Sequence, residues 1–398
     1  MSAKPDTAVN LIDNMLDQGL MRGASDIHFE SGKDLFRVRF RIDGILHVVA
    51  TPAVQLRDAI VSRLKVLARM DIAEKRMPQD GRIPYAYKSE VVDLRVSSLP
   101  TVHGEKIVVR ILNFNRIRPD LNALGYEADD QLKLREAMER PHGLILMTGP
   151  TGSGKTSSLY SCLELVNRED INLATVEDPA EIQLVGANQV NINEKAGLTF
   201  ASALRALLRQ DPDVIMVGEI RDLETAEIAI QASQTGHLVL STLHTNDAPS
   251  TLARLRHMGI PAFHVAASLT MVTAQRLIRR LCDRCKVPLN HQEVESLHSQ
   301  LNVHRPDAQP QETSEPVTAF KAFGCQACDK GYKGRIGLFQ VMPVSAAMQA
   351  LILRDAPTQT LSAQASQEGV RSLREAGWLK VLQGVTSMDE MMALTPHG

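Results

Sequence analysis

The chain has 398 residues with 44% hydrophobic and 4% aromatic side chains, and its 44 Lys and Arg nearly balance 46 Asp and Glu. That length predicts more than one domain, with cores built mainly from aliphatic side chains. A net charge of −2 argues against a protein that binds nucleic acid through general basicity. No apolar run approaches the roughly 20 residues of a membrane-spanning helix, and Met1–Asp6 lacks a signal-peptide pattern. A cytoplasmic location, where thiols stay reduced, is therefore predicted.

Residues 1–113 have the pattern of an α+β domain. Helical spacing of apolar residues predicts helices over 9–20 and 53–70. Alternating apolar and polar residues predict strands near 27–29, 36–42, 46–48, 91–97 and 106–112, with a turn at Asp43-Gly44 and a break at Pro78–Gly81. The stretch that follows, 114–126, contains Pro119, shows no periodicity and is interpreted as a linker.

Between residues 127 and 275, short apolar runs alternate with helical segments. Strands are predicted at 144–147, 173–176, 214–217 and 238–240. This order favours an α/β fold with a mainly parallel sheet and helices on both faces. Beyond about residue 276 the sheet pattern stops, and 345–394 is interpreted as short helices with breaks near Gly369, Gly377 and Gly384.

A phosphate-binding loop follows the strand predicted at 144–147. Gly149–Thr156 fits G-x-x-x-x-G-K-S/T between a strand and a helix. Its glycines allow backbone N–H groups to converge on an anion, to which the helix N-terminus adds its dipole. Lys155 is expected to reach the β- and γ-phosphates of ATP, and Thr156 to bind Mg²⁺. The alternative is a glycine-rich turn with a chance lysine. The predicted nucleotide-binding residues are Gly149, Pro150, Thr151, Gly152, Ser153, Gly154, Lys155, Thr156 and Ser157.

Two glutamates follow predicted strands of this sheet. Glu177 lies in Thr175–Pro179, and Glu219 ends Val214–Glu219. The carboxyl ends of parallel strands form the edge where ligands bind. Hydrolysis needs one carboxylate to hold the metal and another to orient the attacking water. We expect Glu219 to hold Mg²⁺ and Glu177 to orient the water, although the roles could be exchanged. Alternatively, either glutamate only caps the next helix.

Histidines and arginines are further candidates. His237 and His244 flank the strand predicted at 238–240 and are expected to contact the γ-phosphate or report its loss; the alternative is a pair of satisfied core histidines. An arginine from another domain or subunit assists phosphoryl transfer. Arg41 and Arg76 are chosen from the first-domain cluster, against the alternative of an ordinary salt-bridged surface. The cluster comprises Arg37, Arg39, Arg41, Arg63, Arg76 and Arg82.

Two C-x-x-C pairs, Cys282 with Cys285 and Cys325 with Cys328, suit a tetrahedral Zn²⁺ site. Four thiolates leave no open coordination position, so the zinc would be structural. The Pro306–Pro316 stretch is expected to be mobile and to accommodate the long gap between the pairs. The alternative is four reduced cysteines in a small core. Cys162, in the helix after the phosphate loop, is interpreted as a core residue.

Together these stretches resemble the secretion-type AAA-like ATPases that drive type II secretion and type IV pilus assembly. The similarity covers nearly the whole chain. Its motifs are Ala24–His28, Arg39–Gly44, Asp71–Arg76, Pro78–Arg82, the phosphate loop, Thr175–Glu181 (aspartate box), Arg209–Asp222 (Walker B region), Thr235–Asn246 (histidine box), the four cysteines and Gly334–Phe339.

The resemblance implies a RecA-like phosphate-loop core at 127–275. Around it, it implies a PAS-like domain of the family's second N-terminal type at 1–113, a four-cysteine zinc region at 276–340 and a helical region at 341–398. It also implies a hexamer of identical subunits in which first-domain arginines complete the ATP site across the linker. The ring would act on an inner-membrane platform protein from the cytoplasmic side. The cysteine pairs favour the assembly and secretion branch.

Family members usually carry an extra N-terminal docking domain, and here the first motif begins already at Ser25. We therefore expect that docking uses another surface or a separate partner, or that this is a shortened form of the protein. Three other functions stay open: a pilus retraction or DNA-uptake motor, a nucleic-acid-binding zinc module, and an inactive structural ring subunit. The intact phosphate loop, few aromatics and absence of a basic run speak against the nucleic-acid module.

Overall fold

The computed structural model describes residues 8–88, 90–112, 120–295, 297 and 319–395. The chain divides into two compact units, Met1–Ile117 and Arg118–Gly398. Residues 113–119, which include the first part of the predicted linker, and the Pro306–Pro316 stretch lie outside the described residues. In the parts that the structure describes, no helix combines the length and apolar composition that crossing a membrane requires.

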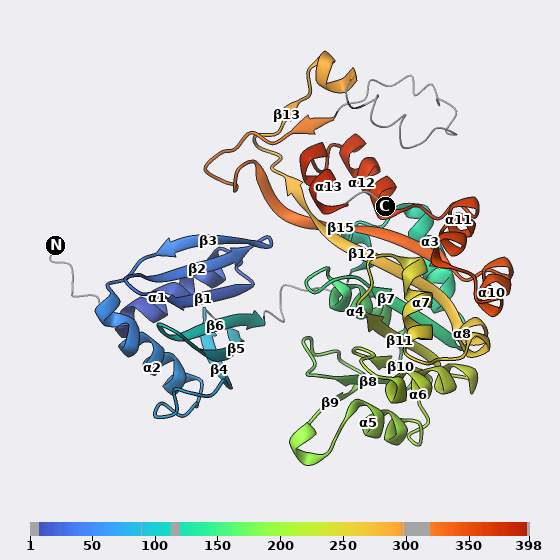
Figure 1. The fold of residues 1–398 in the computed structure, drawn as a ribbon, viewed down its shortest axis with the longest axis horizontal. Coiled ribbons are helices and arrows are strands. Elements are labelled where there is room, and N and C mark those ends of the chain that lie inside the picture. The colour runs from blue at the N-terminus through green and yellow to red at the C-terminus, as the bar shows by residue number, and fades with distance from the viewer. Residues whose placement is uncertain (1–7, 89, 113–119, 296, 298–318, 396–398) are drawn as a thin grey trace. The chain divides into compact units, whose positions relative to one another are not determined.

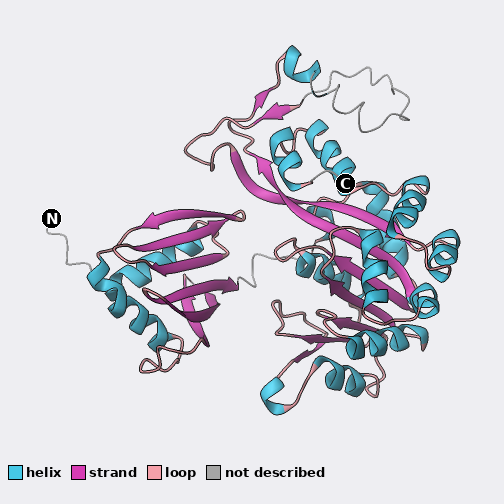
Figure 2. Ribbon diagram, viewed as in Figure 1, coloured by secondary structure: helices cyan, strands magenta, loops and turns pink. Residues whose placement is uncertain are grey.

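The first unit is an antiparallel sheet with two helices, as Figures 1 and 2 show. Strand order in the sheet is β3-β2-β1-β6-β5-β4. The helices are α1 (Ala8–Met21) and α2 (Arg57–Leu67), the latter preceded by a 3-10 turn at Val54–Leu56. The strands are β1 (Asp26–Ser31), β2 (Phe36–Ile42), β3 (Ile45–Ala50), β4 (Gln79–Tyr87), β5 (Glu90–Thr101) and β6 (Gly104–Leu112).

Alternation along β2 explains this arrangement. Phe36, Val38 and Phe40 are fully buried, and they share a core with apolar residues of α1 and α2. The arginines between them point to the other face of the sheet. The predicted helices and strands of this unit are present, but β4 was not predicted. It begins at Gln79, inside the segment interpreted as a break, and its residues pair with β5 along their whole length.

The second unit is built on a mainly parallel sheet with the order β15-β12-β7-β11-β10-β8-β9. Neighbouring strands from β12 to β9 are parallel, and β15 is antiparallel to β12. Each of the four predicted strands is present, so the α/β fold class is confirmed. The strands are β7 (Gly143–Thr148), β8 (Leu173–Glu177), β9 (Asn188–Asn191), β10 (Val214–Val217), β11 (Leu238–Leu243), β12 (Leu269–Leu281) and β15 (Tyr332–Pro343).

Helices cover this sheet on both faces (Figure 2). Leu144 and Leu146 of β7 belong to a large core with α5–α8, α10 and α11, whereas α4 contacts β7 and β11. Two 3-10 turns lie at Leu121–Ala123 and Glu194–Ala196. The α-helices are α3 (Ala128–Met138), α4 (Lys155–Val166), α5 (Phe200–Leu207), α6 (Leu223–Gln234), α7 (Ala248–His257), α8 (Ala262–Ser268), α10 (Ala346–Leu353), α11 (Thr358–Gln367), α12 (Leu373–Leu382) and α13 (Met388–Leu394).

The prediction that the sheet stops near residue 276 was wrong. β12 continues to Leu281, and β15 returns to pair with it. The first half of β12 is buried on both sides, so it lacks the alternation that identifies a strand from sequence. Beyond β12, the short strands β13 (Val287–Pro288) and β14 (Phe320–Lys321) pair with each other.

The short C-terminal helices are present, but one predicted break was misplaced. Gly369 and Gly384 each follow a helix with positive φ, as the sequence indicates. Gly377 instead lies inside α12. A Cβ there would lie 2.5 Å from Cγ of Met391 in α13, so this glycine allows the two helices to approach.

Candidate nucleotide site

The phosphate loop joins β7 to α4. Lys155 is the first residue of α4, and Gly154 precedes it with φ of 90°. Gly149 has φ of 146°, and a Cβ at this position would lie 2.4 Å from the carbonyl oxygen of Gln275. Both positions therefore require glycine, one for its backbone conformation and the other for close approach as well. The loop has the strand–loop–helix context that the motif needs.

The ammonium group of Lys155 lies folded onto this loop. Its Nζ donates to the carbonyl oxygens of Gly149 at 2.7 Å and Pro150 at 3.1 Å. Burial lowers the pKa of Lys155, and the negative charge of Glu219 opposes that shift. Glu219 is thus close enough to act on the lysine electrostatically. The two carbonyl contacts are ones that a phosphate oxygen can replace.

Gln275 of β12 contacts the phosphate loop through its side chain. Its Nε2 donates to the carbonyl oxygen of Ser153 at 2.8 Å, and its side chain is buried. A Cβ on Gly154 would lie 3.3 Å from the same nitrogen. Sequence reasoning missed Gln275 because β12 joins the sheet only through tertiary pairing. A glutamine within the mostly apolar stretch Met271–Ile278 was the available signal.

Glu219 lies at the carboxyl edge of the sheet, just after β10. Its Oε1 accepts a hydrogen bond of 2.5 Å from Arg221, and its Oε2 lies 3.6 Å from Nε2 of His244. Arg221 also bonds Asp178 at 3.2 Å. The next helix, α6, is capped by Asp222, so Glu219 is no helix cap. Arg221 was another residue that sequence reasoning missed, although its position two residues after the acid at a strand end was a signal.

Glu177 ends β8 at the same edge and is buried, with 5% of its surface exposed. Its Oε2 accepts from the hydroxyl of Tyr160 at 2.6 Å, and its Oε1 accepts from Thr175 at 2.6 Å and Gln189 at 3.2 Å. The next helix, α5, is capped by Thr199, which removes the capping alternative for this glutamate too. The two glutamates thus share an edge but differ in environment, one enclosed and the other partly exposed near the lysine.

The two histidines lie at opposite ends of β11. His244 follows the strand and lies beside Glu219. His237 precedes it, and the pairing of Leu238 with Gly143 places it at the edge away from the phosphate loop. Six residues of strand separate the edges, about 20 Å. Nδ1 of His237 lies 2.9 Å from the carbonyl oxygen of Ala232. Within one chain, the prediction that His237 contacts the nucleotide therefore has to be corrected.

Arg41 and Arg76 both belong to the first unit. Arg41 donates to the carbonyl oxygen of Gly44 at 2.9 Å and lies 3.7 Å from Asp26. Arg76 pairs with Glu74 at 2.9 Å and is largely exposed. Both guanidinium groups keep exposed surface and local partners only, so they could exchange those partners for another anion. Their part in catalysis stays a prediction.

The four predicted zinc ligands come together. The sulfurs of Cys282, Cys285, Cys325 and Cys328 all lie within 4.8 Å of one another. The sulfur–sulfur distances are 3.9 Å for Cys282–Cys325, 3.7 Å for Cys285–Cys328 and 3.6 Å for Cys325–Cys328. A tetrahedral site with Zn–S bonds of about 2.3 Å spaces its sulfurs about 3.8 Å apart. The donor set and its spacing therefore fit zinc. Cys162 is buried inside α4 and away from this cluster.

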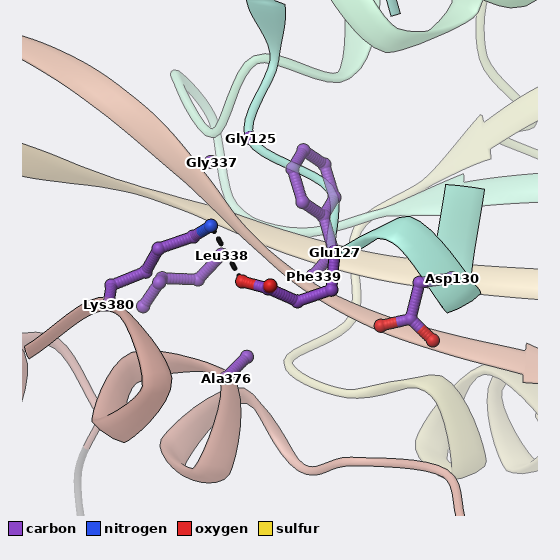
Figure 3. Close-up of a pocket in the computed structure, with 8 residues that line it drawn as sticks. All are labelled: Gly125, Glu127, Asp130, Gly337, Leu338, Phe339, Ala376 and Lys380. Atoms are coloured by element: carbon purple, nitrogen blue, oxygen red, sulfur yellow. Dashed lines mark ion pairs between the residues drawn. The ribbon is translucent and has the colours of Figure 1, made fainter. Parts of the chain in front are cut away.

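A small pocket lies between the start of the second unit and α12 (Figure 3). Lys380 pairs across it with Glu127 at 2.7 Å. Nearby, Asp130 is buried and pairs with Arg371 at 2.7 Å. Because these charged groups form ion pairs with one another, the pairs connect the C-terminal helices to the core. Its lining residues are Gly125, Glu127, Asp130, Gly337, Leu338, Phe339, Ala376 and Lys380.

The chain is similar in sequence to known ATPases over nearly its whole length. Type IV pilus assembly ATPase PilB of Acinetobacter baylyi is 50% identical over 389 residues, which make up 97% of this chain and 66% of that protein. Type II secretion system ATPase E of Vibrio cholerae serotype O1 is 46% identical over 388 residues, 97% of this chain and 75% of that protein. The chain thus spans about two thirds to three quarters of the length of these relatives.

The fold is shared with a solved ATPase. The Legionella pneumophila ATPase DotB matches 99% of this chain and 97% of its own with a TM-score of 0.70 at 19% sequence identity. A profile of the family described as "Type II/IV secretion system protein" matches residues 2–393. The chain therefore belongs to the type II/IV secretion system protein family.

Proposed function

We propose that the chain hydrolyses ATP. The observation that carries this proposal is the position of Lys155 on a phosphate loop, with Glu219 and Glu177 at the carboxyl edge of the same sheet. The loop amides and Lys155 bind the β- and γ-phosphates, and the helix dipole of α4 favours their negative charge. The strands that precede these groups, β7, β8 and β10, are buried along their whole length. Their packing fixes the positions of the groups, as phosphoryl transfer requires.

Thr156 and Glu219 would hold Mg²⁺, which neutralises charge on the phosphates. Their hydroxyl and carboxylate oxygens are hard ligands of the kind this ion prefers. Glu177 orients the attacking water. His244, next to Glu219, reports the loss of the γ-phosphate to the neighbouring strand end. The four cysteines hold a structural Zn²⁺, for which their spacing fits.

The chain acts as a motor subunit in a hexameric ring, and Arg41 and Arg76 complete the ATP site. The ring drives assembly of a type IV pilus or a type II secretion pseudopilus through a platform protein of the inner membrane, from the cytoplasmic side. The names of the relatives support this system, since they are pilus assembly and type II secretion ATPases. The cysteine cluster supports assembly over retraction.

The test is phosphate release by the full chain and by Lys155→Ala. Removing the ammonium group should abolish turnover, because the phosphates lose their positive clamp. Lys195→Ala, at an exposed lysine of the 3-10 turn Glu194–Ala196, is the matched control and should keep full activity. Turnover by Lys155→Ala within a few-fold of the parent would place the reaction elsewhere, and an inactive parent protein would favour a structural ring subunit.

Ring formation is tested separately by light scattering with and without a non-hydrolysable ATP analogue. We expect a mass six times that of one chain in the presence of the analogue. Arg41→Ala and Arg76→Ala should keep nucleotide binding and lose turnover if these arginines complete the site. A monomeric chain that turns over ATP at the full rate would contradict the ring, but not the hydrolysis.

A further inference from the structure

The carboxylate of Glu177 is held by three side chains from three different elements. Thr175 belongs to β8, Tyr160 to α4 and Gln189 to β9, and their donor atoms lie 2.6, 2.6 and 3.2 Å from the carboxylate oxygens. Both oxygens are therefore engaged. A carboxylate fixed in this way cannot rotate, so the direction of its remaining lone pairs is set by its donors.

Gln189 is itself fixed by the backbone that follows Glu177. Its Oε1 accepts from the N–H of Leu184 at 2.8 Å, and its Nε2 donates to the carbonyl oxygen of Ile182 at 2.9 Å. The same nitrogen lies 3.0 Å from the hydroxyl of Tyr160. These contacts determine which end of the amide faces the carboxylate. Gln189 thus ties the loop after β8 to the glutamate and the tyrosine.

Tyr160 connects the glutamate to the phosphate loop. It lies on α4, five residues after Lys155, and its side chain is fully buried. Burial and the neighbouring Glu177 raise the pKa of Tyr160, so its hydroxyl stays protonated and remains a donor. Because a helix moves as a unit over one or two turns, Lys155 and the donor to Glu177 cannot shift independently.

We propose that Tyr160 and Gln189 are positioning residues that act through Glu177. They donate hydrogen bonds to its carboxylate and set its orientation relative to the helix that binds the phosphates. This inference rests on the proposed ATP hydrolysis and adds two residues to it. The consequence is that nucleotide binding and water orientation are mechanically linked through α4 rather than set by separate elements.

The test compares Tyr160→Phe with the parent chain in steady-state hydrolysis and in nucleotide binding. Loss of the hydroxyl should lower kcat about 10- to 100-fold, the scale of a displaced catalytic group. KM for ATP and the affinity for a fluorescent ATP analogue should stay within about twofold, because α4 and Lys155 are unchanged. Gln189→Leu is a second variant that should show the same split.

Tyr332→Phe is the matched control. It also removes a buried phenol, one that lies 2.6 Å from the Ser387 hydroxyl in the C-terminal part of the unit. Its kcat should be that of the parent. Thermal melting of each variant reports whether a loss of activity comes from unfolding, and Gln189→Leu carries the test if Tyr160→Phe does not fold.

A double-mutant cycle separates positioning from a general structural effect. In single-turnover assays, adding Tyr160→Phe to a Glu177→Gln variant should not lower the hydrolysis rate further, because the tyrosine hydroxyl then has no carboxylate to orient. Costs that add in the double variant, or an unchanged kcat in Tyr160→Phe, would overturn the inference. The proposed function has its own test. Normal turnover by Lys155→Ala would contradict the proposed hydrolysis site as a whole. Loss of turnover in Lys155→Ala together with full activity of Tyr160→Phe would contradict only the positioning role.

Discussion

Arg221 donates a hydrogen bond of 2.5 Å to Glu219, and the same guanidinium bonds Asp178 at 3.2 Å. One arginine thus bridges carboxylates that follow two adjacent strands, β10 and β8. Without this positive charge, the two carboxylates would repel each other and any incoming polyphosphate. The pairing keeps Glu219 in place beside His244 and within electrostatic range of Lys155.

Glu219→Gln should keep nucleotide binding and lose turnover by about 10²-fold or more, the scale of a positioned acid–base or metal-holding group. The amide preserves shape and contact with Arg221 but removes the charge that holds Mg²⁺. Phosphate release measures turnover, and titration with a fluorescent ATP analogue measures binding. Glu227→Gln, at an exposed glutamate of α6, should change neither quantity. Loss of nucleotide affinity in Glu219→Gln would assign this residue to binding instead.

Gln275→Leu should weaken nucleotide binding about tenfold. The leucine removes the donor to Ser153, so a buried carbonyl at the base of the phosphate loop loses its partner, which costs about 1–3 kcal/mol. Equilibrium titration of the analogue gives the dissociation constant. Gln340→Leu removes a buried glutamine of β15 that accepts from Ala248 in α7 and serves as the control. Equal weakening in both variants would indicate a general loss of packing.

Cys325→Ser should release the zinc and lower the melting temperature while leaving nucleotide affinity intact. Three thiolates and a hydroxyl bind the ion less tightly, and its binding free energy contributes to folding. Metal content by mass spectrometry, melting temperature and analogue binding are measured on the same preparation. Cys162→Ala changes a buried thiol outside the cluster and should keep the metal. Freshly purified parent protein without bound metal would refute the zinc site.

Glu30 should make the first unit sensitive to acid. Burial acts to raise its pKa, but hydrogen bonds from Arg39, Arg37 and Lys106 lower it to about 2. A folded-state pKa below the unfolded value stabilises the fold at pH values above about 4.5, and this stabilisation is lost as the pH falls toward about 2.

Glu30→Gln should therefore unfold at a lower temperature than the parent at pH 7, and the difference should shrink steadily between pH 4.5 and the acid limit. Scanning calorimetry across this range measures it. Glu90→Gln, at an exposed glutamate of β5, should follow the parent at every pH. A Glu30→Gln difference that stays constant with pH would show that packing, not charge, is responsible.

Local patterns predicted much of the fold and part of the candidate site. Gly149–Thr156 carries its own strand and helix signals, and the cysteine pairs carry their own spacing, so neither depends on distant contacts. β12 and β15 could not be predicted in the same way. Their residue pattern reflects burial between other elements rather than a local period. Gln275 reaches the phosphate loop only because β12 pairs with β7.

The side-chain partners of the glutamates were also beyond local pattern. Glu177 and Glu219 both follow strands, yet one is enclosed by Tyr160 and Gln189 and the other pairs with Arg221. That difference arises from elements brought together by the sheet order. The error over His237 has the same origin: proximity to a strand in sequence does not say which end of the strand it occupies.

The strand order has a consequence for biosynthesis. β7 is flanked by β11 and β12, both of which follow it in the chain. A nascent chain leaving the ribosome therefore exposes a complete phosphate-loop motif long before Gln275 and the rest of β12 have been translated. Products that terminate between the end of α4 and residue 269 contain every residue of the motif yet lack β12, the strand on which the loop rests. We therefore expect chaperones or proteases to act on such products before they can bind nucleotide.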